Sequence, residues 1–275
     1  MELMGAGHAT AAQRIKRALP PRLRRTLKRL VGRGRFDEVE LIHQLLREQP
    51  LPRTMVDVGA HHGASLEPFA LQGWAVIAFE PDPKNRAVLQ RLCGRFPELR
   101  LDPRALSNQA ATEVPWYTSE LSTGISSLAA FHESHEQSHR VEVTTLDRAL
   151  DDHGVDRIDF LKIDAEGTDL FVLQGLPWKR IEPSVVLCEF EDAKTEALGY
   201  GFRDLAGLLV EQGYRVLVSE WHPITAYGAR HRWRRLLPYP CELEDARAWG
   251  NLIAVRSEQE LERLMSLAPA TGAPG

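Results

Sequence analysis

A glycine turn and two acids close to it are the residues of this chain best placed to do chemistry. Asp57 lies in the apolar run 54–58, which leads into a Gly-Ala-His-His-Gly turn at residues 59–63. Glu80 ends the next apolar run, about 20 residues beyond the turn, the offset at which a carboxylate binds ribose hydroxyls. Because glycine has no Cβ, such a turn lets the backbone approach a ligand closely. The spacing predicts a nucleoside site in which Asp57 organises the turn and Glu80 holds the ribose.

The spacing of the two glycines argues against a dinucleotide. Dinucleotide sites use G-x-G-x-x-G, in which closely placed glycines and a helix N-terminus hold a pyrophosphate. Here three residues separate Gly59 from Gly63, and the side chain of His61 would crowd a pyrophosphate. The turn therefore favours a ligand without phosphate, such as S-adenosylmethionine, over a nicotinamide cofactor. A purely structural turn, with Asp57 capping the loop amides and Glu80 at the surface, is the alternative interpretation.

A second group of acids follows a third apolar run, residues 158–163. Asp164 and Glu166 come directly after this run, and Glu189 ends a further predicted strand. Ligands bind at the carboxyl ends of strands in open α/β sheets, where acids can contact a cofactor amino group, act as a base or hold a metal. Oxygen ligands suit Mg²⁺, so Asp164 and Glu189, beside Glu166, are candidate metal ligands. The structural alternatives are an N-cap cluster for the next helix and a solvated strand end.

Alternating strands and helices must position these groups. Continuous apolar runs between turn signals predict strands, and apolar residues at helical spacing predict helices. The predicted strands are residues 54–58, 75–80, 99–102, 113–117, 141–145, 158–163, 184–189, 214–219 and 252–255. The predicted helices are residues 37–47, 65–72, 84–93, 146–150, 169–175 and 202–212. This alternation predicts a doubly wound α/β sheet, which ends with two strands separated by an irregular insertion instead of a helix.

On these motifs the chain resembles an FkbM-type S-adenosylmethionine-dependent methyltransferase. The matching stretches occur in family order over roughly residues 54–192. They are Val56-Asp57-Val58-Gly59-Ala60, Phe79-Glu80-Pro81, Ala105-Leu106-Ser107, Ser126-Ser127-Leu128, Thr145-Leu146-Asp147, Phe160 to Gly167 and Val172-Leu173-x-Gly175. The resemblance implies a class I methyltransferase (Rossmann-like) fold, with a seven-stranded, mostly parallel sheet whose last strand is antiparallel. It also implies methylation of a hydroxyl on a saccharide or natural product, as in polysaccharide biosynthesis.

The resemblance assigns roles to the site residues, with S-adenosylmethionine as the cofactor. The implied cofactor contacts are Gly59, Ala60 and Gly63 on the methionine side, Glu80 at the ribose, Asp102, Ala105 and Ser107 near adenine, and Asp164 at the reacting end. The family commonly has Asn where this chain has His61. Both side chains form hydrogen bonds, but histidine is bulkier and titratable. His61 is therefore the point at which this chain departs from the family pattern.

The insertion at residues 220–250 combines aromatic residues with arginines. Aromatic rings stack on sugar faces and arginines pair with anionic groups, so we interpret it as a substrate flap. His222 and His231 within it are candidate catalytic bases, in addition to Asp164 and Glu166. A structural flap with a solvated basic face is the alternative.

Three histidines form a weaker candidate metal site. His132, His135 and His139 would share one face if they lay on a helix. The polar residues around them favour plain solvent exposure instead.

The remaining sequence features define a plan of domains. Residues 1–50 form a basic helical N-terminal extension, residues 51–257 the methyltransferase domain, and residues 258–275 a tail with a disordered end. Residues 14–35 contain ten Lys or Arg and no acid, with leucines at helical spacing. This segment is either a solvated helix packed on the domain or a basic amphipathic helix that contacts an anionic membrane or glycan.

Composition and cysteine content exclude several classes of protein. The net charge of −4 gives no case for a nucleic-acid partner. No apolar run reaches the ~18 residues that a membrane span needs, and the N-terminus lacks a signal-peptide pattern. Three distant cysteines argue against a disulfide framework and a cysteine zinc site. We expect a cytoplasmic protein, peripheral to the inner membrane if the basic segment binds lipid.

Two other functions compete with methylation of a glycan or small-molecule acceptor. A nicotinamide-dependent oxidoreductase is disfavoured by the missing phosphate loop and by the ending of the sheet. A non-catalytic glycan-binding module on the same fold is disfavoured by the presence of Asp57, Glu80 and Asp164.

Overall fold

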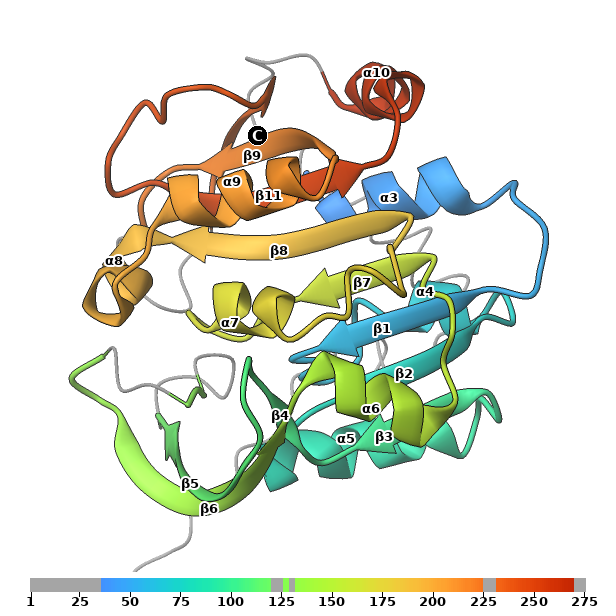
Figure 1. Ribbon diagram of the computed structural model, residues 1–275, viewed down its shortest axis with the longest axis vertical. Helices are drawn as coiled ribbons and strands as arrows, with labels where there is room; N and C mark the ends of the chain where they lie inside the picture. The colour runs from blue at the N-terminus through green and yellow to red at the C-terminus, as the bar shows by residue number, and fades with distance from the viewer. Residues whose placement is uncertain (1–35, 120–125, 129–131, 225–230, 270–275) are drawn as a thin grey trace, which may run out of the picture. The chain divides into compact units, whose positions relative to one another are not determined.

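The structure, a computed structural model, describes residues 36–119, 126–128, 132–224 and 231–269 (Figure 1). The basic segment 14–35, residues 225–230 of the insertion and the end of the predicted tail lie outside the described residues. From Asp37 onward the described residues belong to one compact unit. Within these ranges, no helix is both long and apolar enough to cross a membrane.

A mostly parallel sheet of eight strands forms the centre of this unit, in the order β10-β9-β11-β8-β7-β1-β2-β3. In chain order the strands are β1 (Thr54–Val58), β2 (Ala75–Phe79), β3 (Leu99–Asp102), β7 (Phe160–Ile163), β8 (Val185–Glu191), β9 (Arg215–Trp221), β10 (Trp233–Pro238) and β11 (Trp249–Val255). β11 lies antiparallel between β8 and β9. This arrangement confirms the predicted class I fold with an antiparallel last strand.

The eighth strand, β10, is a departure from the prediction. It lies within the insertion, where we predicted irregular chain, and pairs antiparallel with β9 at the edge of the sheet. Its pairing register shifts between Trp233 and Arg235, so its residues do not alternate regularly between two faces. A short, irregular edge strand of this kind leaves no period-two pattern in the sequence.

The inner strands are apolar because helices cover both faces of the sheet. Every residue of β7 is buried, and the ring of Phe160 lies 5.2 Å from that of Phe69. Leu161 and Ile163 belong to the core on the opposite face. The charged exception in β7 is Lys162, which stands in register with Asp57 of β1.

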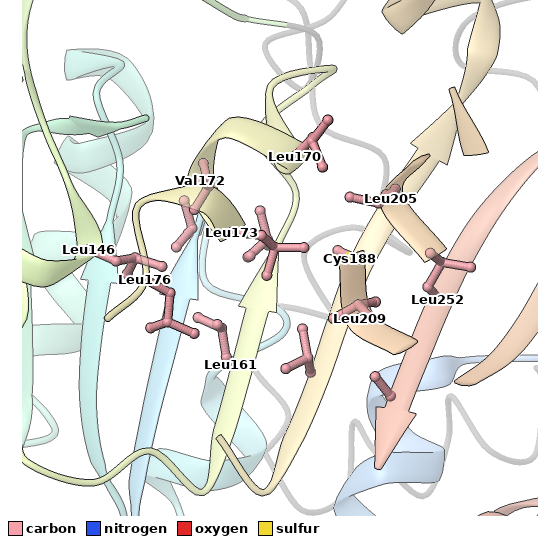
Figure 2. Close-up of a cluster of buried hydrophobic side chains, with 14 of the residues drawn as sticks. Leu146, Leu161, Leu170, Val172, Leu173, Leu176, Cys188, Leu205, Leu209 and Leu252 are labelled. Atoms are coloured by element: carbon pink, nitrogen blue, oxygen red, sulfur yellow. The ribbon is translucent and has the colours of Figure 1, made fainter. Parts of the chain in front are cut away.

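Three helices cover one face of the sheet, namely α6 (Leu146–His153), α7 (Asp169–Gln174) and α9 (Phe202–Glu211). Figure 2 shows Leu173 of α7 and Leu205 and Leu209 of α9 packing with Cys188 of β8 and Leu252 of β11. The helices α3 (Glu38–Leu46), α4 (Glu67–Ala70), α5 (Pro83–Cys93) and α10 (Glu258–Leu267) lie on the opposite side (Figure 1). The predicted doubly wound arrangement is therefore present.

Helices α3 and α10 belong to the same unit, although the predicted boundaries at 51 and 257 leave them outside it. Buried Glu38 of α3 accepts hydrogen bonds from the Ser219 hydroxyl (2.6 Å), the Trp221 indole (2.7 Å) and the Asn251 amide (3.2 Å). Helix α10 begins with a capping box between Ser257 and Glu260. We predicted a tail there, although Ser-x-x-Glu is a recognised sign of a helix start.

A smaller sheet of three strands, in the order β4-β6-β5, lies between β3 and α6 in the chain. Its strands are β4 (Ala105–Leu106), β5 (Ala111–Thr118) and β6 (Glu136–Thr144). It also shows where the three histidines of the weaker candidate metal site lie. His132 and His135 lie in a turn, and His139 lies in β6. The three side chains therefore do not share a helical face.

Candidate active site

A cavity of about 260 Å³ lies at the carboxyl ends of β1, β2 and β7, with the small sheet as one wall. Its lining contains five of the ten predicted cofactor residues, namely Gly59, His61, Glu80, Ala105 and Asp164, and also the predicted catalytic Glu166. Further lining residues include Asn85, Arg104, Leu106, Trp116, Ser126, Leu128 and Thr168. The main chain topology thus brings together the glycine turn, the ribose acid and the acids that follow β7.

Gly59 sits where the turn touches the end of β7. Its φ is +74°, and a Cβ at this position would lie 1.9 Å from the backbone oxygen of Asp164. The amides of Gly59 and Ala60 both donate to the Phe79 carbonyl, at 3.0 and 3.1 Å. Only glycine allows the turn this conformation and this approach. The requirement comes from contact between the turn and β7, and it holds the turn beside the cavity.

Gly63 serves the packing of a helix and does not line the cavity. A Cβ there would meet the side chains of Leu92 at 2.6 Å and Leu89 at 2.9 Å, both in α5. Ala60 is also absent from the cavity lining, and it is buried behind the turn. A glycine that lets a helix approach looks the same in sequence as one that lets a ligand approach, which explains the different placement of Gly63.

Glu80 is held in place by backbone amides. One carboxylate oxygen accepts from the amide of His61 at 2.7 Å, and the other accepts from the amide of Asp82 at 2.8 Å. Burial raises the pKa of Glu80 to about 7, although these two amides act in the opposite direction. Each carboxylate oxygen can accept more than one hydrogen bond, so Glu80 keeps acceptor capacity on the cavity side.

His61 adopts a left-handed conformation, with φ of +48°, and stacks on His62 with ring centroids 3.8 Å apart. Burial lowers its pKa, and the neighbouring His62 acts in the same direction. A left-handed φ is tolerated by Asn better than by most residues other than glycine. The position that departs from the family pattern is therefore a conformationally demanding one.

Asp57 lies beneath the turn in a buried ion pair. The Lys162 ammonium is 3.3 Å from Asp57 and 3.3 Å from Asp164, and the Ser65 hydroxyl donates to Asp57 at 2.5 Å. Burial alone would lower the pKa of Lys162, but the two carboxylates raise it. Lys162 is therefore a fixed cation that joins the first strand to Asp164. Asp57 is absent from the cavity lining and acts on the site through this lysine.

The predicted adenine contacts divide into one that lines the cavity and two that do not. Ala105 lines it, whereas the Asp102 carboxylate is bound by the Arg104 guanidinium at 2.6 Å and by His153 at 2.9 Å. Burial opposes ionisation of Asp102, but the hydrogen bonds from Arg104 and His153 leave its pKa below the ordinary value. Ser107 uses its backbone amide to bind the Thr144 carbonyl within the small sheet. Arg104, which the sequence did not single out, lines the cavity in place of Asp102.

The acids at the reacting end form a close group. One oxygen each from Asp164, Glu166 and Glu189 lies within 4.8 Å of the others. Lys194, in the short helix α8 (Asp192–Thr195), is 2.6 Å from Glu166 and 2.9 Å from Glu189. The sequence placed the three acids correctly at one edge, but nothing in it signalled this lysine.

The turn that carries Glu166 is constrained on both sides. Glu166 has a φ of +51°, and its carbonyl accepts a hydrogen bond from the buried Ser127 hydroxyl at 2.9 Å. Burial raises the pKa of Glu166 to about 7, with Lys194 acting to lower it. Nearby Asp169, bonded to the amides of Ala165 and Glu189, also has its pKa raised to about 7 by burial. A carboxylate near neutral pKa at this edge is suited to proton transfer.

The two candidate histidine bases lie away from the cavity lining. His222 follows β9 and contacts the Arg234 guanidinium at 2.9 Å, and the His231 ring lies 5.0 Å from that of Trp249. β9 is three strands from β7 in the sheet, or about 14 Å at the usual strand spacing. Burial and Arg234 lower the pKa of His222. Their position leaves Asp164 and Glu166 as the predicted bases that line the cavity.

Two arginines of the insertion, Arg234 and Arg235, are bound internally. Buried Glu220 in β9 pairs with Arg234 at 3.0 Å and with Arg235 at 2.6 Å, and it also accepts from the Glu244 amide at 2.8 Å. These contacts attach the insertion to the sheet edge. Arg234 and Arg235 are thus used in structure, where we predicted contact with an anionic acceptor.

Comparison with known proteins supplies a family for this geometry. A model of the methyltransferase FkbM domain matches residues 57–216. No curated protein matches the chain.

Solved structures similar to the chain include precorrin-6y C5,15-methyltransferase from Geobacter metallireducens, with 13% identity over 79% of this chain and 86% of that one, and a TM-score of 0.41. Another is the C-terminal domain of the corresponding Rhodobacter capsulatus enzyme, with 14% identity, 79% and 86% coverage, and a TM-score of 0.40. A third is a TehB-like S-adenosylmethionine-dependent methyltransferase from Corynebacterium glutamicum, with 12% identity, 86% and 97% coverage, and a TM-score of 0.38.

Proposed function

The chain belongs to the FkbM methyltransferase family and is a methyltransferase that uses S-adenosylmethionine, and we propose that it methylates a hydroxyl of a saccharide or natural-product acceptor. The observation that carries the proposal is one cavity lined by a ribose-type acid, Glu80, and by two acids at the adjacent strand end, Asp164 and Glu166. A nucleoside held at one end would then present its reactive group to carboxylates at the other.

The residues present fit this cofactor. Glu80 is fixed by two backbone amides and keeps acceptor capacity for ribose hydroxyls. Gly59, in the turn after β1, lines the cavity. Ala105 and Leu106 line the side next to β3 and provide apolar contact for a base. The methionine end would then lie towards Asp164 at the end of β7.

S-Adenosylmethionine supplies a methyl group on a sulfonium, which departs as a neutral thioether. In the transfer, the acceptor oxygen bonds to the methyl carbon while the carbon–sulfur bond breaks and leaves its electron pair on sulfur. The hydroxyl proton must go to a base, because an alcohol that keeps this proton is a poor nucleophile. We assign this role to Glu166, whose pKa of about 7 suits it. Asp164, tied to Lys162, orients the reacting end.

The first test is ligand binding, measured by isothermal titration with S-adenosylhomocysteine and with NAD. We expect binding of S-adenosylhomocysteine and none of NAD; the reverse result would support an oxidoreductase. Transfer of tritiated methyl to candidate glycans then separates an enzyme from a glycan-binding module.

The second test is Asp164→Asn, with Asp156→Asn as the matched control, because Asp156 is exposed. Loss of orientation and charge at the reacting end should reduce turnover by about a hundredfold or more. Full turnover by the Asp164 variant would remove this residue from the mechanism.

We keep as a separate proposal that the basic segment 14–35 contacts an anionic membrane or glycan surface. Sedimentation with anionic vesicles, before and after deletion of residues 1–36, measures this directly. Unchanged vesicle binding after the deletion would contradict it.

A further inference from the structure

Lys194 is a buried cation surrounded by carboxylates at the edge of the proposed reacting site. Its ammonium lies 2.6 Å from Glu166, 2.9 Å from Glu189 and 2.9 Å from Glu191, and its side chain is 5% exposed. Three carboxylates therefore share one lysine. The contacts with Glu166 and Glu189 are charge-assisted hydrogen bonds, which are among the strongest in proteins, and the contact with Glu191 is an ion pair.

Two of these carboxylates, those of Glu166 and Glu189, also belong with Asp164 to a group that could hold a divalent metal. Asp164, Glu166 and Glu189 each place one oxygen within 4.8 Å of the other two. Mg²⁺ needs its oxygen ligands at about 2.0–2.1 Å. The Lys194 ammonium already lies within hydrogen-bonding distance of two of these acids, Glu166 and Glu189. A divalent ion would have to displace these contacts and lie next to a positive charge, so the cluster does not fit Mg²⁺ while Lys194 is present.

The main chain is shaped to bring this lysine in. Gly167, next to Glu166, has a φ of +93°, and a Cβ there would lie 3.2 Å from the Cβ of Lys194. Its absence allows the β7–α7 turn to pack closely on α8. The Tyr200 hydroxyl donates to the Gly167 carbonyl at 2.9 Å and fixes the turn from the other side. The position of the ammonium is thus built from three separate segments.

We propose that Lys194 is the resident cation of the reacting site, where it takes the place of a divalent metal and holds Glu166 and Glu189 in position. Lys194 is a positioning residue, because it acts through these acids. Methyl transfer then needs no divalent ion. This last statement rests on the proposed function, whereas the occupancy of the cation position does not.

The proposal makes a specific expectation for Lys194→Ala. Removal of the ammonium should allow Asp164, Glu166 and Glu189 to bind a divalent ion, because the positive charge that repels the ion is gone. We expect the affinity for Mn²⁺, used as a paramagnetic probe for Mg²⁺, to rise by about a hundredfold over the unsubstituted protein. Mn²⁺ binding is measured by electron paramagnetic resonance, without cofactor or acceptor. Lys194→Arg keeps the charge and should gain no Mn²⁺ binding.

Lys179→Ala is the matched control, because Lys179 is exposed and its loss changes the net charge equally. If Lys179→Ala gained as much Mn²⁺ affinity as Lys194→Ala, or if Lys194→Ala folded and gained none, the proposal would be wrong. Circular dichroism establishes that each variant is folded. Should Lys194→Ala fail to fold, the unsubstituted protein and Lys194→Arg still decide the question, because tight Mn²⁺ binding by either would contradict a resident cation.

Turnover gives the second readout. The unsubstituted protein should keep its rate after exhaustive chelation, and Lys194→Ala should lose most of its rate and recover part of it with Mg²⁺ or Mn²⁺. Loss of turnover on chelation of the unsubstituted protein, restored by Mg²⁺, would overturn the proposal. Failure of S-adenosylhomocysteine to bind would instead count against the proposed function, since the Mn²⁺ experiment involves neither cofactor nor acceptor.

Discussion

Two buried groups of charges lie on the same sheet and are composed in opposite ways. At the reacting edge, Glu166, Glu189 and Glu191 share the single ammonium of Lys194. At the sheet edge, the single carboxylate of Glu220 is shared by the guanidinium groups of Arg234 and Arg235 and by a backbone amide. One group has more acids than cations, and the other has more cations than acids.

The difference separates a site from a structural attachment. Glu220 is 1% exposed and has a partner for each oxygen, so its role is to hold β10 and the insertion against β9. At the reacting edge the acids outnumber their cation, and burial raises the pKa of Glu166 to about 7. An acid that is buried and only partly compensated can exchange a proton near neutral pH. Substitutions in the two groups should therefore affect different quantities.

The largest effect is expected for Glu166→Gln. Glutamine keeps an oxygen to accept from Lys194 but cannot take up the acceptor proton. We expect turnover at saturating cofactor to fall by about 10²- to 10⁴-fold, the range for loss of a general base, with affinity for S-adenosylhomocysteine within a few-fold. Single-turnover methyl transfer measures the rate. A variant with unchanged turnover would move the proton acceptor to Asp164.

Glu220→Gln should show the reverse pattern. Removal of one partner from a buried ion pair leaves two arginines without their carboxylate and costs about 3 kcal/mol in the free energy of unfolding. Turnover of the folded variant should stay within a few-fold, because Glu220 is absent from the cavity lining. Urea denaturation measures the loss.

Glu242→Gln is the control for this variant, because the pair of Glu242 with Arg203 is exposed and should contribute less than about 1 kcal/mol. Equal stability losses in the two variants would show that burial does not distinguish the pairs.

The position of the reacting edge in the sheet could be predicted from the sequence, but the contacts among its side chains could not. Continuous apolar runs and the offset from the glycine turn to Glu80 are local signals. They placed Asp57 within a strand and Glu80 and Asp164 at strand ends, and in the structure Asp57 lies in β1 while Glu80 and Asp164 directly follow β2 and β7. Lys194 reaches Glu166 across 28 residues of chain through a four-residue helix. No local pattern reports such a contact, because it depends on how two loops meet.

Other differences have equally physical causes. Gly63 was assigned to the ligand because a glycine needed for packing and one needed for binding leave the same trace. β10 has no regular alternation, since its pairing register shifts at an edge. The start of α10, in contrast, could have been predicted from the sequence, because the Ser257–Glu260 capping box is a local signal that we missed. Trp116 of β5 also lines the cavity, and the sequence pattern that predicts this strand does not indicate where it packs.

A smaller effect is expected at the cofactor end, from the pH dependence of Glu80. Ribose hydroxyls donate to the ionised carboxylate, and burial raises the pKa of Glu80 to about 7. Affinity for S-adenosylhomocysteine should therefore increase as the pH rises through about 7. Glu80→Gln should weaken binding about tenfold above that pH and flatten the profile. Isothermal titration between about pH 6 and 8 tests this, because that range covers about one unit on either side of the pKa.

The same raised pKa has the opposite consequence for stability. The folded protein binds this proton more tightly than the unfolded chain, whose glutamate has its ordinary value of 4.5. The contribution of Glu80 to stability is present below that value and is lost as the pH rises through about 7. Glu98→Gln, at an exposed position, should change neither profile. A pH profile of stability that is unaltered in Glu80→Gln would contradict the assignment.

The smallest effect is expected for Ser127→Ala, which tests whether the reacting edge depends on the segment 126–128, whose Ser127 pairs with Tyr117 of β5. The Ser127 hydroxyl is fully buried and donates to the Glu166 carbonyl at 2.9 Å. Its loss leaves that hydrogen bond unmade and should cost about 1 kcal/mol in the free energy of unfolding. Because the turn holding Glu166 would also loosen, turnover should fall several-fold.

Exposed Ser138→Ala should change neither quantity. In the double variant with Glu166→Gln, the turnover loss from Ser127→Ala should disappear, since the positioned carboxylate is already gone; a loss that persisted would mean that Ser127 acts on the cavity by another route.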